Sequence, residues 1–118
     1  MISLSELVAQ LSLEVCAAEQ KLDTEVTGGY ASDLLSYVMA RAKEGNVWVT
    51  MQSHANVVAV ASLVNLAGVI ITEGARPEPA TLAKANQEEI PILATPLSTY
   101  TVAGKLYELG VGNEGLTE

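Results

Sequence analysis

Short polar segments stand at three places in the sequence, each between an apolar run and a predicted helix. Their side chains could bind a ligand: Gln52, His54, Asn56, Thr72, Glu73, Gly74, Thr95 and Thr99. If the apolar runs are parallel strands, these segments follow the carboxyl ends, where open α/β sheets bind ligands. Each segment leads into a helix start, whose free N–H groups and dipole favour an anion. We therefore expect one crevice; the alternative is that these residues only cap helices and form turns.

Single residues here admit both a chemical and a structural interpretation. His54 is the only histidine, and it could bind a ligand, respond to pH or cap a helix. Glu73 and Asp33 could be general bases, or capping and solvated carboxylates. Arg76 could hold a phosphate or carboxylate bidentately, or remain a surface residue. One histidine and one cysteine are too few for a zinc site, so no metal or cofactor is expected.

The sequence lacks the motif that phosphate transfer would require. A GxxxxGK[ST] loop needs a lysine after its last glycine, but Tyr30 follows Gly28 and Gly29. No GxSxG segment occurs either. We therefore predict a binding role without catalytic residues. The alternatives are a small phosphotransferase or hydrolase that uses His54 and Glu73, and a structural partner protein of a larger redox or signalling complex.

Length and composition predict one soluble domain. The 118 residues suit a single domain over 1–118, with its core at about 26–111. The net charge is −8, from 14 acidic and 6 basic residues, and the scattered cations argue against a nucleic acid partner. The longest apolar run, 56–71, is interrupted by polar residues and would not span a membrane. The single cysteine and the absence of a signal-like start favour the cytoplasm.

Local patterns predict alternating helices and strands along the whole chain. The elements expected first are a helix after a Ser3–Glu6 capping box, a strand over 11–17, a loop over 26–30, and a helix over 34–39 capped by Ser32 or Asp33. The elements expected next are strands over 47–51, 69–72 and 90–94, a deeply buried helix over 56–67 stopped by Gly68, a helix opened by Pro77 and Pro79, a last helix capped by Ser98 or Thr99, and a frayed tail over 112–118.

The last three strands begin about 22 residues apart, and each is followed by a helix. This rhythm predicts right-handed βαβ crossovers and a parallel core sheet. The fold class is therefore α/β, a single three-layer domain with a mainly parallel sheet flanked by helices.

Two segments at matching spacing resemble those of DRTGG domains. Residues 69–79, VIITEGARPEP, resemble the strand, TGG-type turn and proline-started helix of that family. Residues 90–100, IPILATPLSTY, resemble its IPVL-T-x-x-D-T-Y segment, and 47–50 align with the strand before its Gly-Asp-Arg stretch. The resemblance covers about 26–111.

Two departures from the family pattern matter for function. Gln52, Ser53 and His54 stand where the family has Asp-Arg, so that function is not carried over. Glu73 replaces the first glycine of Thr-Gly-Gly, whereas Thr72 and Gly74 match.

The resemblance also implies a fold and a role. The fold is similar to the N-terminal domain of HPr kinase/phosphorylase, from which short stand-alone members take the label "serine kinase"; the catalytic half is absent here. Related domains in CBS-containing pyrophosphatases and long phosphotransacetylases look regulatory and tend to dimerise. The expected role is therefore a regulatory or ligand-sensing module, a homodimer that binds a small anionic or nucleotide-like ligand or a protein partner.

Overall fold

The computed structural model describes residues 2–112, which form seven strands and five α-helices. The helices are α1 (Leu4–Leu11), α2 (Leu35–Arg41), α3 (Asn56–Val64), α4 (Pro79–Glu88) and α5 (Thr99–Glu108), and Glu19–Lys21 form one 3-10 turn. The strands are β1 (Ile2–Ser3), β2 (Glu14–Ala17), β3 (Glu25–Val26), β4 (Gly28–Ala31), β5 (Asn46–Thr50), β6 (Gly68–Ile71) and β7 (Ile92–Ala94). All of the frayed tail predicted over 112–118 except Gly112 lies outside the described residues.

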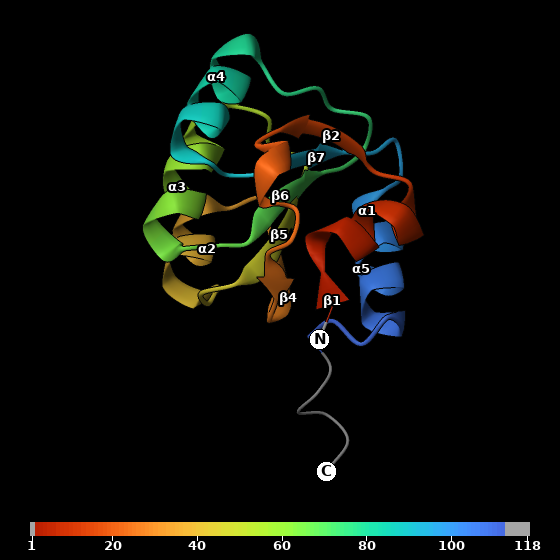
Figure 1. The fold of residues 1–118 in the computed structure, drawn as a ribbon. Coiled ribbons are helices and arrows are strands. Elements are labelled where there is room, and N and C mark those ends of the chain that lie inside the picture. Colours follow the sequence, from red (N-terminus) through yellow and green to blue (C-terminus); the bar gives the residue numbers. More distant parts are fainter. Residues whose placement is uncertain (1, 113–118) are drawn as a thin grey trace.

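The main sheet has five strands in the order β2-β7-β6-β5-β4. Strands β4 to β7 are parallel, and β2 joins the edge of β7 in the antiparallel direction. Helices α2, α3 and α4 cover one face, and α1 and α5 cover the other (Figure 1). The predicted three-layer domain with a mainly parallel sheet is therefore confirmed. Strands β1 and β3 form a separate small ribbon.

Each face of the sheet has its own apolar core. On the α1–α5 face, residues such as Leu7, Ile70 and Leu93 pack together. On the α2–α4 face, Trp48 is fully buried beside Val57 and other aliphatic residues. All five residues of β5 are buried, as expected for a parallel strand that is covered on both sides.

The prediction of a glycine-marked loop over 26–30 is wrong. Gly28–Ala31 form β4, which pairs with β5 from Gly28↔Asn46 to Ala31↔Val49. A Cβ added at Gly28 would lie 3.0 Å from the Asn46 side chain, so a glycine allows this close pairing. Pairing with β5 therefore overrides the local turn signal.

Two helix boundaries also differ from expectation. Neither Ser32 nor Asp33 is the N-cap of α2, a position held by Leu34. Helix α3 ends at Val64 with Asn65 in the left-handed conformation, whereas Gly68 already belongs to β6. Helix α3 is buried on one side only, because Leu63 remains 69% exposed.

We predict that Leu93→Ala lowers the free energy of unfolding by about 2–5 kcal/mol, because Leu93 is fully buried beneath α1 and α5 and its loss leaves a cavity. Urea denaturation measures the effect. The matched control, Leu63→Ala on the exposed side of α3, should change it by less than about 0.5 kcal/mol. Equal effects of the two substitutions would contradict this assignment of the core.

Candidate functional site

A threonine stands at the carboxyl end of each of the three central strands. Thr50, Thr72 and Thr95 are all buried, and each hydroxyl bonds to the loop or helix start that follows a strand. A β-branched side chain suits a strand, and its hydroxyl can hold the polar groups of a turn. The three strand ends thus share one rim of the sheet, as the βαβ rhythm predicted, and Thr50 belongs to it although sequence reasoning did not single it out.

The loops after β6 and β7 are joined by backbone hydrogen bonds. Glu73 N donates to Leu97 O at 2.8 Å, and Gly74 N donates to Thr95 O at 3.1 Å. The hydroxyls of Thr72 and Thr99 lie 2.6 Å apart. The structure therefore brings together five of the predicted residues: Thr72, Glu73, Gly74, Thr95 and Thr99.

Glu73 shapes this cluster with both its backbone and its carboxylate. Glu73 and Gly74 both have positive φ, 65° and 74°, and this conformation costs a non-glycine residue about 1 kcal/mol or more. The Glu73 carboxylate accepts a hydrogen bond from Thr99 N at 2.9 Å. A negative charge at the start of α5 is favourable because of the helix dipole. The first amide of α5 is thus bound by the chain's own carboxylate.

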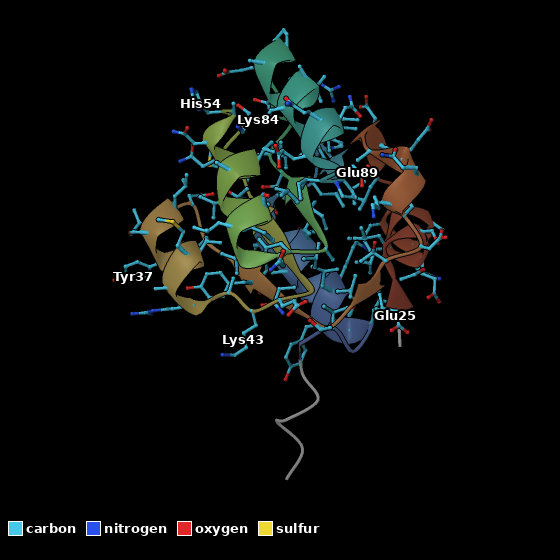
Figure 2. The ribbon with its side chains drawn as sticks, turned by 60° about the vertical axis from the view of Figure 1, so that its left-hand side comes forward. Glu25, Tyr37, Lys43, His54, Lys84 and Glu89 are labelled. Carbon is cyan, nitrogen blue, oxygen red and sulfur yellow. The ribbon has the colours of Figure 1, made fainter. Side chains whose placement is uncertain are left out.

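Gln52 and His54, on the loop between β5 and α3, and Asn56, the first residue of α3, form a separate group. Gln52 Nε2 donates to Asp33 O at 3.1 Å, and Asn56 N donates to His54 Nδ1 at 3.0 Å. The adjoining Ser53 O accepts hydrogen bonds from Glu78 N and from the Thr81 hydroxyl, which ties this loop to the start of α4. His54 is exposed and points outward just before the amino end of α3 (Figure 2). None of these hydrogen bonds leads to Thr72, Glu73 or Thr95.

At two of the three predicted helix starts, α3 and α5, the first amide is bound within the chain and is not free for a ligand. Asn56 N is bound by His54, and Thr99 N is bound by Glu73. The Ser98 hydroxyl, as predicted, caps α5 by accepting from Thr101 N at 3.1 Å. The geometry favours the capping interpretation of His54 and Glu73. Each side chain lies close enough to accept a hydrogen bond from the first amide of a helix, which would otherwise lack a partner in the helix.

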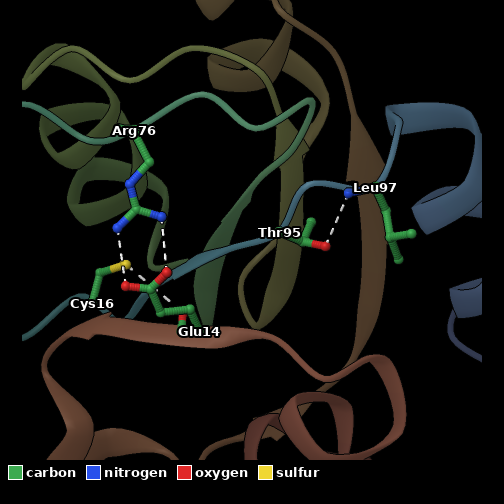
Figure 3. A network of polar contacts seen from close by, with 5 residues as sticks. All are labelled: Glu14, Cys16, Arg76, Thr95 and Leu97. Atoms are coloured by element: carbon green, nitrogen blue, oxygen red, sulfur yellow. Dashed lines mark hydrogen bonds and ion pairs between the residues drawn. The ribbon is translucent and has the colours of Figure 1, made fainter.

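A hollow of about 410 Å³ adjoins the joined loops on the β2 side. Its lining residues are Ser12, Glu14, Gly74, Ala75, Arg76, Ala94, Thr95 and Pro96. Arg76 donates from both terminal nitrogens to the Glu14 carboxylate, at 2.8 and 2.9 Å (Figure 3). This ion pair is exposed, so it contributes little to stability.

Sequence reasoning considered Arg76 but did not include it in the site, and it missed Glu14 altogether. The two residues are 62 positions apart, so no local spacing reveals their pairing. The only available signal was that Arg76 closely follows the Thr72–Gly74 turn.

A second hollow, of about 620 Å³, is lined by residues of β1, β3 and the end of α5: Ile2, Glu6, Val26, Thr27, Leu109, Gly110 and Val111. Its one charged lining residue is acidic, whereas Arg76 supplies a cation to the smaller hollow. Charge therefore distinguishes the two hollows more clearly than size does, and an anion would favour the one with Arg76.

The Glu14–Arg76 pair shifts the pKa values of its own two members and of the neighbouring Cys16 thiol. The hydrogen bonds and charge of Arg76 hold the pKa of Glu14 below its ordinary value, and Glu14 raises the pKa of Arg76. Burial raises the pKa of the neighbouring Cys16 thiol, and the Glu14 charge raises it further, while Arg76 lowers it. The pKa of the Cys16 thiol therefore depends on the charges of both Glu14 and Arg76.

The model of the DRTGG domain family matches residues 6–109, which is most of the chain. The chain belongs to the DRTGG domain family. Its five-stranded sheet is similar to a solved structure of the CBS and DRTGG domains of the regulatory region of Clostridium perfringens pyrophosphatase, complexed with the activator diadenosine tetraphosphate. The TM-score is 0.70 at 18% identity, a level at which the likeness establishes the fold.

This similarity covers 86% of the present DRTGG chain but only 44% of the pyrophosphatase chain. No protein of curated function matches the sequence. Within residues 2–112, no helix has the length and apolar character needed to cross a membrane. The segment Gly110–Gly115 fits GxGxxG spacing, but it follows helix α5, whereas a dinucleotide-binding loop follows a strand.

We predict that the Cys16 thiol titrates above its ordinary pKa, so that less thiolate is present at a given mildly alkaline pH than in the unfolded chain. Glu14→Gln should lower the midpoint by removing a negative charge, and Arg76→Gln should raise it. The rate of alkylation by iodoacetamide, followed against pH, measures the midpoint. The urea-unfolded protein is the reference, and an equal midpoint in the folded protein would contradict the prediction.

Proposed function

We propose that this DRTGG domain is a non-catalytic regulatory module that binds a small anionic or nucleotide-like ligand in the hollow beside Arg76. The observation that carries the proposal is the Arg76 guanidinium, which lies at the hollow and is held by one exposed carboxylate, Glu14. A guanidinium binds phosphate and carboxylate in the same bidentate geometry. A phosphorylated ligand would therefore compete with Glu14 for Arg76.

The other predicted residues have supporting roles in this proposal. Gly74 and Thr95 line the hollow, and the cluster of Thr72, Glu73 and Thr99 fixes the loops that form it. Gln52, His54 and Asn56 remain candidates for contacts with the distal part of a larger ligand, from the neighbouring loop after β5. The ligand class is also supported by the C. perfringens regulatory region, whose structure holds diadenosine tetraphosphate as activator.

The hydrogen bonds of His54 and Glu73 favour a structural role over the enzymatic alternative. That alternative relied on His54 and Glu73 for proton transfer, but each accepts a hydrogen bond from the main chain at a helix start. A side chain that satisfies such a donor has a structural role, so we assign neither residue to catalysis.

We predict that phosphorylated probes raise the melting temperature of the protein, because a ligand that binds only the folded state stabilises it. The probes are inorganic phosphate, ATP and diadenosine tetraphosphate. Arg76→Gln should weaken binding about tenfold or more, since a hydrogen bond to a charged group contributes roughly 1.5–3 kcal/mol. Glu14→Gln should strengthen binding, because the competing carboxylate is gone.

The matched control for this experiment is Lys43→Gln, which removes the same charge near the amino end of β5, away from the hollow. Two results would overturn the proposed ligand site. One is that no probe raises the melting temperature of the native protein or of Glu14→Gln. The other is that Arg76→Gln and Lys43→Gln weaken binding equally, which would indicate only a general effect of charge.

A homodimer is part of the proposed function. The described surface exposes several large apolar side chains, among them Leu34, Tyr37 and Tyr100, the last 89% exposed. Large exposed apolar side chains of this kind favour burial against another protein. We predict that the protein sediments as a dimer at micromolar concentration in analytical ultracentrifugation, and a monomer over the whole range would contradict this.

A further inference from the structure

The backbone is irregular where β2 ends. The register of β2 with β7 shifts at Cys16, and this bulge packs two consecutive residues, Cys16 and Ala17, against the core of the α2–α4 face. Ala18, which follows the strand, is buried and has a φ of 53°, a left-handed conformation that is unfavourable for a residue with a side chain. Bulges and strained residues occur often beside functional sites, where they turn a side chain toward a ligand.

A hollow of about 290 Å³ opens beside this irregular segment. It is lined by residues 15–20 and by Asn86 of α4. Asn86 Oδ1 accepts a hydrogen bond from Ala18 N at 2.8 Å, and Lys21 forms an exposed ion pair with Glu89 at 3.5 Å. These two contacts join the walls of the hollow, which are the turn after β2 and the carboxyl-terminal half of α4.

The hollow offers a hydrogen-bond donor on one wall and acceptors on the other. Because Ala18 N occupies the Oδ1 atom of Asn86, the amide of Asn86 is left with its Nδ2 donor. Glu19, which lines the same hollow and is exposed, carries a carboxylate that can only accept. Within residues 2–112, neither Asn86 Nδ2 nor the Glu19 carboxylate has a hydrogen-bond partner. Both groups are therefore free for a ligand.

This hollow lies next to the hollow at Arg76. Cys16 lines the first and Glu14 lines the second, and the Arg76 guanidinium interacts with both side chains (Figure 3). Cys16 Sγ also lies 3.7 Å from Glu14 O. The chain advances by about 13 Å from Glu14 to Ala18 if it is fully extended. The two hollows therefore lie end to end along the β2 edge and could hold one elongated ligand.

We propose that these two hollows together bind a guanine nucleotide, with its phosphate on Arg76 and its base between Asn86 and Glu19. This assignment rests on the proposed function, in which an anion binds Arg76, and it names the ligand class of that site. Guanine carries an acceptor, O6, beside its N1–H and N2–H donors. Asn86 Nδ2 donates to O6, and the Glu19 carboxylate accepts from the two N–H groups. Adenine has an amino group in place of O6, so it sets a donor against Asn86 Nδ2.

The charges along the β2 edge fit a ligand that is anionic at one end only. Arg76 supplies the positive charge for a phosphate. The charged residue that lines the other hollow, Glu19, is acidic and would repel a second anionic group. A guanine base is uncharged and donates to a carboxylate, whereas a small molecule with a negative charge at each end would meet repulsion. A nucleotide therefore fits both hollows better than a dicarboxylate or a diphosphorylated sugar.

The first test compares GMP, AMP and inorganic phosphate by isothermal titration calorimetry of the whole chain. GMP should bind about tenfold or more tightly than AMP, because hydrogen-bonding groups of the protein that a ligand leaves unpaired weaken its binding. GMP should also bind more tightly than phosphate, which reaches only the Arg76 hollow. Arg76→Gln should weaken the binding of all three probes.

The second test exchanges the donor at Asn86. Asn86→Asp keeps an oxygen for Ala18 N but replaces Nδ2 with an acceptor, so the affinity for GMP should fall about tenfold or more. The affinity for phosphate should stay unchanged, since about 13 Å exceeds the Debye length at physiological salt. Gln87→Asp is the matched control, because it adds the same charge to α4 at a residue that does not line the hollow.

Glu19→Gln probes the acceptor side without touching the Asn86–Ala18 contact. It should also weaken GMP binding about tenfold and leave phosphate binding unchanged, because a carboxylate accepts both guanine N–H groups and an amide accepts only one. Circular dichroism checks that Asn86→Asp, Gln87→Asp and Glu19→Gln all fold.

Two outcomes would overturn the assignment of guanine. One is that GMP binds no more tightly than AMP. The other is that Asn86→Asp weakens GMP binding no more than Gln87→Asp does, with Glu19→Gln equal to the native protein. In both cases, phosphate binding that is lost in Arg76→Gln would leave the proposed ligand site intact. Absence of binding by every probe would overturn the ligand site as well.

Discussion

Parallel strands must be covered on both faces, and this requirement governs the rest of the molecule. Strands β5 to β7 are built mainly from aliphatic residues, with Trp48 fully buried, and each face of the sheet is covered by helices. The helices and the two faces of the sheet leave little space for polar groups in the core, so these groups gather at the strand ends and edges. Polar side chains that could bind a ligand therefore lie at the rim and the edges of the sheet.

At the rim, the chain satisfies many of its own hydrogen-bonding groups. His54 and Glu73 accept from amides at the starts of α3 and α5, and the buried threonine hydroxyls hold the loops. Within the described residues, no buried side-chain nitrogen or oxygen lacks a hydrogen-bond partner. A ligand must therefore compete with an existing interaction. Competition is easiest at the Arg76–Glu14 pair, because both side chains are exposed and an exposed pair is weakly stabilising.

The sequence could predict the features that depend on local pattern. The capping box at Ser3, the strand–helix rhythm and the parallel direction of the central strands are confirmed, because hydrophobic spacing and capping chemistry act over a few residues. Strand β4 could not be predicted, since its glycines signal a turn and only pairing with β5 makes them a strand. The Glu14–Arg76 pair was inaccessible for the same reason, because it depends on β2 joining β7.

The two edges of the sheet differ in the chemical groups that they present. Strand β2 is antiparallel, irregular and charged, which blocks further pairing but places the Glu14 carboxylate against Arg76. Strand β4 is parallel to its neighbour, uncharged and flanked by exposed apolar residues. The register shift in β2 hinders pairing with a further strand, and the uncharged β4 edge offers no cation to an anion. The proposed binding of an anion therefore belongs at the β2 edge, where Arg76 supplies the positive charge.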